Sequence, residues 1–393
     1  HLGGGVGTVV LNWLRKEQEV STDFSHRIAS LEITKNPLVK EFESCGLAIY
    51  EGLYGRKYVL REWIAQSDIV LIHWWNHPRL FDLLVNMSFP QCRIIIWDHV
   101  SSLFPPYCIS ERLVEIADCF VFTSPVSYES KEVKELPESL KERLDVVWSA
   151  FGSENFDCFM RREHEGFIVG ITGTCDYAKL HPDFVKMCAK VVIPDVRFIV
   201  CSGDSQDKVK KDAAGAGIID RFVFMGRVPS VFPYLAIYDV FGYPLQHKHF
   251  GTCEQALGEA MMAGAVPVVL NNPAERYIVE DGVTGIVAKT PEEYSRAIEY
   301  LYHNPDKRKE MAQNARASAR EKYSVEKKMK EWRRVFSKVL SVEKKQRVWD
   351  SRKRRTGAEV FIESLGPYGK IFEDYISAKN RGSKRDLLRM EEN

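Results

Sequence analysis

The sequence lacks several patterns that mark whole classes of protein. No apolar run approaches the roughly 20 residues that a membrane-spanning helix needs. The 55 basic and 54 acidic residues give a formal net charge of +1, so charge gives no reason to expect a nucleic-acid partner. The nine cysteines form no Cys-x-x-Cys pair, which argues against a zinc site or a disulfide framework and predicts reduced thiols in a cytoplasmic protein.

What the sequence does contain is typical of two α/β domains. Its 393 residues exceed what one ordinary core requires. Short apolar runs alternate with amphipathic stretches, which predicts βαβ units and parallel sheets. The predicted strands cover residues 27–33, 68–73, 93–98, 119–123, 145–148, 167–171, 197–201, 221–224, 240–243, 266–270 and 285–287. The predicted helices include residues 9–16, 59–66, 111–117, 291–302, 305–322 and 325–340.

A polar segment at residues 161–165 interrupts this alternation and predicts a domain boundary. We expect an N-terminal Rossmann-like domain over residues 1–160, with its first strand upstream of His1. A second Rossmann-like domain is expected over residues 161–324. Residues 325–393 are predicted to form a helix that crosses back to the first domain, followed by a charged tail.

The most informative segment is Phe250–Leu270, in which a polar loop leads into a helix of small residues and then a buried strand. A helix N-terminus presents free backbone N–H groups and a partial positive charge, which suits a diphosphate. Thr252 and Gln255 lie at this end and are candidate binding residues. Glu259 follows about one turn later, where its carboxylate can accept both hydroxyls of a ribose. The alternative is an ordinary helix packed on a sheet, with its glutamates in solvent.

This segment resembles the signature of the retaining GT-B glycosyltransferases of family 4, within the glycosyl transferases group 1. Gly258–Met261 and Ala263–Val268 match the second half of the signature, and Glu280–Gly285 matches the family's E-x-G-x-x-G segment. The resemblance implies a GT-B fold, in which two Rossmann-like, doubly wound parallel-sheet domains face a central cleft. It implies that the N-terminal domain is on the acceptor side and that the second domain binds the nucleotide sugar. It also implies transfer of a sugar from a nucleoside diphosphate sugar to an acceptor hydroxyl, with retention of configuration.

The first half of the signature departs from the family. Two glutamates separated by seven residues are typical of the family, and the first would fall at Gly251 in this chain. The nearest carboxylate is Glu254. Either the loop is rearranged so that Glu254 serves the sugar ring as a catalytic group, or that role is missing. A further alternative is that Glu254 only caps the helix, which the helix dipole favours by ~0.3–1 kcal/mol.

Basic donor contacts follow from the same resemblance. Lys179 matches a family lysine that contacts the leaving diphosphate, and a solvated loop lysine is the alternative. Thr174 stands at the position of a family arginine. Arg227, which follows another predicted strand, is a candidate to replace that arginine.

The opening of the chain is rich in glycine. Gly4, Gly5 and Gly7 lie in a stretch that resembles the N-terminal loop of the family, which faces the donor phosphate or the acceptor. A glycine cluster can also be a structural turn or a dinucleotide loop. We therefore treat these residues as candidate donor contacts.

Two histidines end predicted strands of the first domain. His99 matches a family histidine that contacts the transferred sugar, although a lone histidine is more often structural. His73 and the adjacent Trp74 are candidates for an acceptor surface, because aromatic rings pack against sugars. Buried packing aromatics are the equal alternative.

These patterns predict a metal-independent hexosyltransferase of EC class 2.4 that needs no cofactor. Its expected partners are a UDP- or GDP-sugar and a glycan or lipid-linked acceptor, without nucleic acid. We expect it in the cytoplasm, with a peripheral contact to the inner membrane face through Arg352–Arg355. The alternatives are a degenerate nucleotide-sugar-binding module, which Gly251 and Thr174 favour, and a GT-B-type nucleotide-sugar epimerase.

Overall fold

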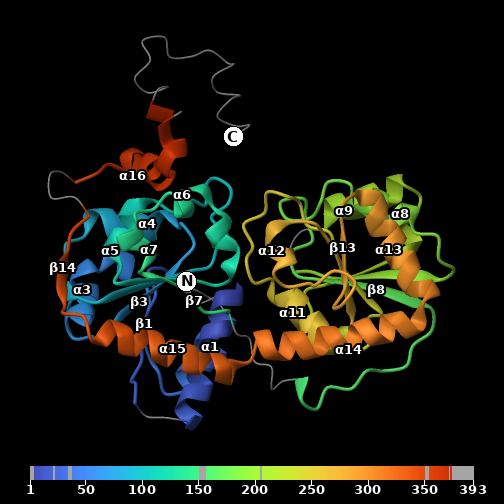
Figure 1. Cartoon of the computed structure of the whole chain (residues 1–393), viewed down its shortest axis with the longest axis horizontal. Coiled ribbons are helices and arrows are strands. Elements are labelled where there is room, and N and C mark those ends of the chain that lie inside the picture. Colours follow the sequence, from blue (N-terminus) through green and yellow to red (C-terminus); the bar gives the residue numbers. More distant parts are fainter. Residues whose placement is uncertain are drawn as a thin grey trace. The chain divides into compact units, whose positions relative to one another are not determined.

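The computed structural model of the protein describes residues 4–20, 23–33, 38–149, 156–203, 206–349, 354–370 and 372–373. The chain forms two compact units (Figure 1). The first comprises His1–Val147 and Lys328–Asn393, and the second comprises Trp148–Lys327. The limits expected from the sequence fall at residues 160 and 324, inside the second unit in both cases.

The second unit is built on a six-stranded parallel sheet in the order β10-β9-β8-β11-β12-β13. The chain adds β9 and β10 on one side of β8, then returns to place β11 on the other side. This is a doubly wound sheet whose topological switch point lies between β8 and β11. The strands are β8 (Phe167–Thr172), β9 (Val196–Cys201), β10 (Phe222–Gly226), β11 (Val240–Tyr243), β12 (Val266–Leu270) and β13 (Ile286–Ala288).

Helices connect these strands, as parallel pairing requires. They are α8 (Phe184–Lys190), α9 (Asp207–Gly215), α10 (Phe232–Leu235), α11 (Gln255–Met262), α12 (Pro273–Arg276), α13 (Pro291–His303) and α14 (Pro305–Lys322), with a 3-10 turn η4 (Ile219–Arg221).

The first unit contains a four-stranded parallel sheet in the order β3-β5-β6-β7, a parallel pair β1-β2 and an antiparallel pair β4-β14. The strands are β1 (Arg27–Ala29), β2 (Ala48–Tyr50), β3 (Val70–Trp74), β4 (Phe89–Cys92), β5 (Ile94–Asp98), β6 (Cys119–Phe122), β7 (Leu144–Val146) and β14 (Lys345–Arg347). The helices are α1 (Gly4–Val20), α2 (Leu38–Ser44), η1 (Leu53–Gly55), α3 (Lys57–Ala65), α4 (Pro78–Asn86), α5 (Glu111–Ile116), η2 (Pro125–Glu129), α6 (Lys131–Lys134), α7 (Glu138–Lys141), α16 (Gly357–Ser364) and η5 (Gly366–Gly369).

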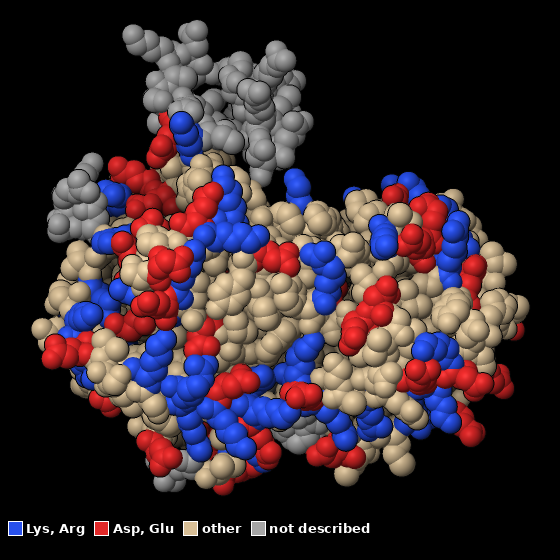
Figure 2. Space-filling view, viewed as in Figure 1, with Lys and Arg blue, Asp and Glu red and all other residues tan. Residues whose placement is uncertain are grey.

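Helix α15 (Val325–Leu340) has the bounds that the sequence predicts, and most of it belongs to the first unit. Most of its apolar side chains are buried, including Met329, Trp332, Val335, Phe336 and Val339, whereas Leu340 at its end is exposed. Trp332 stacks on Trp13 of α1, with ring centroids 5.2 Å apart. Its exposed positions are largely basic, namely Lys327, Lys330, Arg334 and Lys338. Figure 2 shows these charges gathered over the helix, so the amphipathic pattern sets the face that packs on the unit.

The loop expected at the start of the chain is a helix from Gly4 onward. Gly4, Gly5 and Gly7 lie in the first turns of α1, and Gly7 is buried. The apolar residues that follow give this segment one buried face, including Val9 and Leu11. Burial of that face therefore outweighs the low helix propensity of the glycines.

No helix within the described ranges combines the length and apolar character that crossing a membrane requires.

Gly170 in the middle of β8 allows a close approach that no other residue permits. Its backbone lies against the ring of Tyr238, and an added Cβ would lie 2.0 Å from the ring atom Cδ2. Tyr238 is fully buried, so the ring has no room to move. We expect Gly170→Ala to lower the free energy of unfolding by about 1–3 kcal/mol or more, measured as a shift of the urea midpoint.

Gly215 in α9 is the matched control for this change. An added Cβ there meets no atom within 4 Å. Gly215→Ala is therefore expected to leave stability unchanged or raise it by up to about 1 kcal/mol. Equal effects of the two substitutions would contradict the packing argument.

Candidate functional site

The candidate site lies at the carboxyl ends of β8 and β11, where the doubly wound sheet switches direction. Open α/β sheets bind ligands at such a point. The loop after β8 joins the chain after β11 through an antiparallel bridge between Leu180 and Leu245. The Gln246 amide also donates to the Lys179 carbonyl at 2.9 Å. These bonds bring Lys179 beside the segment that follows β11.

Lys179 and Glu254 form the centre of the site. Lys179 Nζ lies 2.8 Å from Glu254 Oε2, and the hydroxyl of Tyr243 donates to the same oxygen at 2.7 Å. Burial by itself raises the pKa of the Glu254 carboxyl, but Lys179 and His249 outweigh it, so the pKa lies below its ordinary value. Burial lowers the pKa of Lys179, and Glu254 outweighs this as well. The site therefore holds an ionised pair.

The Glu254 carboxylate occupies the space that a side chain at Gly251 would fill. An added Cβ on Gly251 would lie 1.6 Å from Glu254 Oε1. Glu254 also has a left-handed backbone, with φ 31° and ψ 74°, which is unfavourable for a residue with a side chain. Glu254 is the N-cap residue of α11, but its side chain makes no capping hydrogen bond to this helix and contacts Lys179 and Tyr243 instead. Strain of this kind gathers at functional sites.

Sequence reasoning missed three buried polar residues behind Glu254. The Nε2 atom of His249 lies 3.0 Å from Glu275 Oε2. Asn272 donates to Glu275 Oε1 at 3.1 Å. Glu275 lies 26 residues from His249 in the sequence, so only the fold brings the two together. The signal that was available is that a histidine directly precedes the candidate loop.

Glu259 lies one turn into α11, as predicted. Burial raises the pKa of its carboxyl to about 7. Among the residues that the structure describes, no side chain donates a hydrogen bond to this carboxylate. Glu259 is thus a half-buried acceptor that can receive hydroxyl donors from a ligand.

The remaining candidates of the second unit lie at the same edge of the sheet. Thr252 is buried in the loop before α11, and Gln255 is the first residue of that helix. Arg227 follows β10 and is exposed, with its guanidinium against the backbone of Gly203 after β9. Thr174 is half-buried in the loop after β8. Their roles toward a ligand stay predictions.

In the first unit, the structure brings His73 and His99 together. His73 is the second-to-last residue of β3 and His99 follows β5, and His73 Nδ1 lies 3.0 Å from His99 Nε2. Burial lowers the pKa of His73 to about 4, and burial together with the neighbouring His73 lowers the pKa of His99 well below its ordinary value. Both rings are therefore neutral at physiological pH, and one donates to the other.

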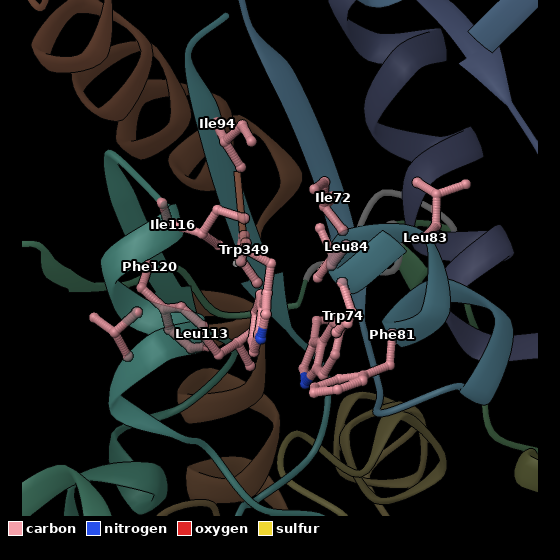
Figure 3. Packing of buried hydrophobic residues seen from close by; sticks show 14 of the residues in the cluster. Ile72, Trp74, Phe81, Leu83, Leu84, Ile94, Leu113, Ile116, Phe120 and Trp349 are labelled. Atoms are coloured by element: carbon pink, nitrogen blue, oxygen red, sulfur yellow. The ribbon is translucent and has the colours of Figure 1, made fainter. Parts of the chain in front are cut away.

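Trp74 is a packing residue, so the interpretation of it as part of an acceptor surface is wrong. Its side chain is fully buried and packs against Phe81 of α4 at a centroid distance of 5.8 Å (Figure 3). Successive side chains of a strand point to opposite faces of the sheet. Because His73 points to one face of β3, Trp74 points into the core on the other.

Residues 159–318 match the protein family described as Glycosyl transferases group 1. An uncharacterized glycosyltransferase of Methanocaldococcus jannaschii is 24% identical over 223 residues, which cover 55% of this chain and 53% of that relative. The chain therefore spans about half the length of the curated relative that it matches.

Solved structures share the fold across most of the chain. A glycosyltransferase from Rickettsia africae has a TM-score of 0.70 and 13% identity, covering 87% of this chain and 96% of its own. Anabaena HepE in complex with UDP-glucose has a TM-score of 0.67 and 14% identity, covering 85% of this chain and 96% of its own. The protein thus has the GT-B fold, and its residues 159–318 are similar to the glycosyl transferases group 1 family.

Proposed function

We propose that this protein is a glycosyltransferase that moves a sugar from a nucleoside diphosphate sugar to an acceptor hydroxyl. The observation that carries the proposal is the Lys179–Glu254 pair at the topological switch point. The lysine supplies positive charge for a departing diphosphate, and the carboxylate beside it accepts hydrogen bonds from sugar hydroxyls. The family match of residues 159–318 supports this chemistry.

In the proposed reaction, the bond between the sugar C1 and the diphosphate oxygen breaks, and a bond from C1 to the acceptor oxygen forms. Lys179 stabilises the charge that develops on the diphosphate. The acceptor proton passes to an oxygen of that diphosphate. We propose attack from the face that the diphosphate leaves, which retains the configuration, and no step of this scheme uses a metal ion.

The other residues take supporting roles in this proposal. Glu254 stays ionised and holds hydroxyls of the transferred sugar, whereas Glu259 holds the ribose. His99 and His73 act as neutral hydrogen-bond partners of the sugar or the acceptor. Thr252, Gln255 and their backbone N–H groups complete the donor site.

A degenerate binding module is the second candidate. The replacement of the family arginine by Thr174 favours it. Gly251 does not, because the Glu254 carboxylate fills the space beside it. An epimerase is not favoured, since the matched family and relative are both described as glycosyltransferases.

A donor screen tests the proposed function. The full-length protein is incubated with UDP-, GDP- and ADP-sugars in EDTA, and thermal shift and slow release of free sugar are measured. We expect a UDP-sugar to stabilise the protein and to be hydrolysed, given the UDP-glucose complex of the similar Anabaena structure. Binding without hydrolysis, and without transfer to a panel of acceptors, supports the degenerate module. If no nucleotide sugar binds, both the glycosyltransferase and the degenerate binding module are ruled out.

Lys179→Met is expected to weaken UDP binding about tenfold to 100-fold, because a charge-assisted hydrogen bond contributes ~1.5–3 kcal/mol. Isothermal titration calorimetry measures this change. Lys208→Met is the matched control, because Lys208 is an exposed lysine that lies over the ring of Tyr177 in the same unit. A Lys179→Met protein with unchanged UDP affinity would remove the diphosphate role.

We further propose a glycan or lipid-linked acceptor and a cytoplasmic location at the inner membrane face. The basic run Arg352–Arg355 motivates the membrane contact, although Arg352 and Lys353 lie outside the described residues. Arg355 Nε contacts Glu363 Oε2 at 3.1 Å. Co-sedimentation with anionic vesicles, compared with neutral ones, tests the contact, and equal sedimentation with both would refute it.

A further inference from the structure

We propose that His249, held by Glu275, is a positioning residue that fixes the loop carrying Glu254 through the backbone amide of Gly251. The inference rests on the proposed function, because the position of Glu254 matters only if its carboxylate contacts the transferred sugar.

The pair is anchored at the end of the sheet. His249 is 4% exposed and Glu275 is fully buried. Glu275 uses one carboxylate oxygen for His249 and the other for Asn272. Asn272 follows β12 and also donates to the carbonyl of Leu245, just after β11, at 3.1 Å. The carboxylate that holds His249 is therefore fixed to two neighbouring strands.

The hydrogen bonds define which nitrogen of His249 carries the proton. The Gly251 amide donates to Nδ1 at 3.0 Å, so Nδ1 is an acceptor and carries no hydrogen. The proton lies on Nε2, which donates to Glu275. This tautomer ties the loop backbone at Gly251, three residues before Glu254.

Protonation of Nδ1 would remove this tie. The charged groups that face His249 are Glu275 from α12, Glu254 before α11 and Lys179 from the loop after β8. Once protonated, Nδ1 can no longer accept from the Gly251 amide, and Glu254 Oε1 lies 3.9 Å from it. Burial lowers the pKa of His249, but Glu275 and Glu254 outweigh it and raise the pKa. The loop should therefore lose its anchor as the pH falls through this raised pKa.

Two substitutions of His249 separate its two hydrogen bonds. In His249→Asn, Oδ1 stands where Nδ1 stands and keeps an acceptor for Gly251. In His249→Gln, Nε2 keeps a donor for Glu275 but the acceptor for Gly251 is lost. At saturating UDP-glucose, we expect His249→Gln to lower the hydrolysis rate about tenfold to 100-fold, because small misplacements of reacting groups have effects of this size. His249→Asn should keep a higher rate than His249→Gln, and its rate should no longer fall as the pH is lowered through the pKa of His249.

Glu275→Gln is a second variant that keeps the shape of the pair. It retains an acceptor for Nε2–H but removes the charge that raises the pKa of His249, so the acid limb of turnover should move to lower pH. Equal losses in His249→Asn and His249→Gln, wild-type rates in both, or an unmoved acid limb in Glu275→Gln would overturn the proposal. Melting temperatures of all three variants identify any loss that comes from unfolding.

A readout without donor separates this proposal from the proposed function. In ¹⁵N-histidine-labelled protein, the His249 resonances, assigned by their loss in His249→Asn, should show the Nε2–H tautomer at pH 8. An Nδ1–H tautomer would overturn the positioning role even if the enzyme is active. If the wild type fails to bind UDP-glucose while this tautomer is found, only the choice of donor or the proposed function fails.

Discussion

Gly251→Ala is expected to lower the turnover of the sugar donor about 100-fold while the protein stays folded. The new Cβ would lie 1.6 Å from Glu254 Oε1 and 2.8 Å from its Cδ, so the methyl group and the carboxylate cannot occupy their places together. Gly251 is not among the glycines with a left-handed backbone, so alanine adds no backbone strain. The carboxylate must therefore leave its contacts with Lys179 and Tyr243. The rate of UDP-glucose hydrolysis measures the loss of turnover, and a thermal melt measures whether the protein stays folded.

The same substitution in a Glu254→Ala background shows whether the effect passes through Glu254. With the carboxylate already absent, Gly251→Ala should cost little more, because the two changes remove one interaction. Additive losses would show that Gly251 acts by another route. The exchange variant Gly251→Glu with Glu254→Gly returns a carboxylate to this space and places glycine at the left-handed position. It should recover part of the turnover that Glu254→Gly alone loses.

Much of the fold follows from local patterns in the sequence. The strands β11 and β12 and the helices α14 and α15 have the bounds that the apolar runs and helical periodicity predict. The two strands are buried throughout, and continuous apolar runs are the signature of such burial, whereas each helix has one buried face. The strand expected over residues 27–33 is shorter, at Arg27–Ala29, because its pairing with Ala48–Tyr50 extends over only three residues.

The candidate site was only partly predictable, because its central contacts join distant segments. Lys179 and Glu254 were both candidates, but their pairing depends on the bridge between the loops after β8 and β11, which no local pattern encodes. The place of Glu254 in the space beside Gly251 depends on a left-handed backbone at a glutamate, which propensity argues against. Trp74 failed as a candidate for a simpler reason. His73 and Trp74 are neighbours on a strand and point to opposite faces, and the sequence alone does not identify which of the two faces the core.

The affinity for UDP-glucose is expected to rise about tenfold between pH 6 and pH 8 because of Glu259. Burial raises the pKa of this carboxyl to about 7 in the free protein. Ribose hydroxyls that donate to the carboxylate favour its ionised form, so binding lowers this pKa. Binding is therefore strongest where Glu259 is already ionised, above pH 7, and weakens as the pH falls below that value. UDP-glucose is the ligand of choice because its diphosphate esters do not titrate in this range.

Glu259→Gln keeps the size of the side chain and removes its charge, so it should bind UDP-glucose more weakly at pH 8 and with little pH dependence.

Glu259→Gln should also make the protein without donor more stable at pH 8. A carboxyl whose pKa is raised on folding stabilises the fold while it is protonated, and this contribution is lost as the pH rises from the ordinary range of a glutamate to about 7. At pH 8 without donor, Glu259→Gln should therefore melt at a higher temperature than the wild type. Glu310→Gln, on the exposed side of α14, is the control for removal of a surface charge. If Glu259→Gln kept the full pH dependence of binding, the titrating group would lie elsewhere, and the ribose contact would lose its main support.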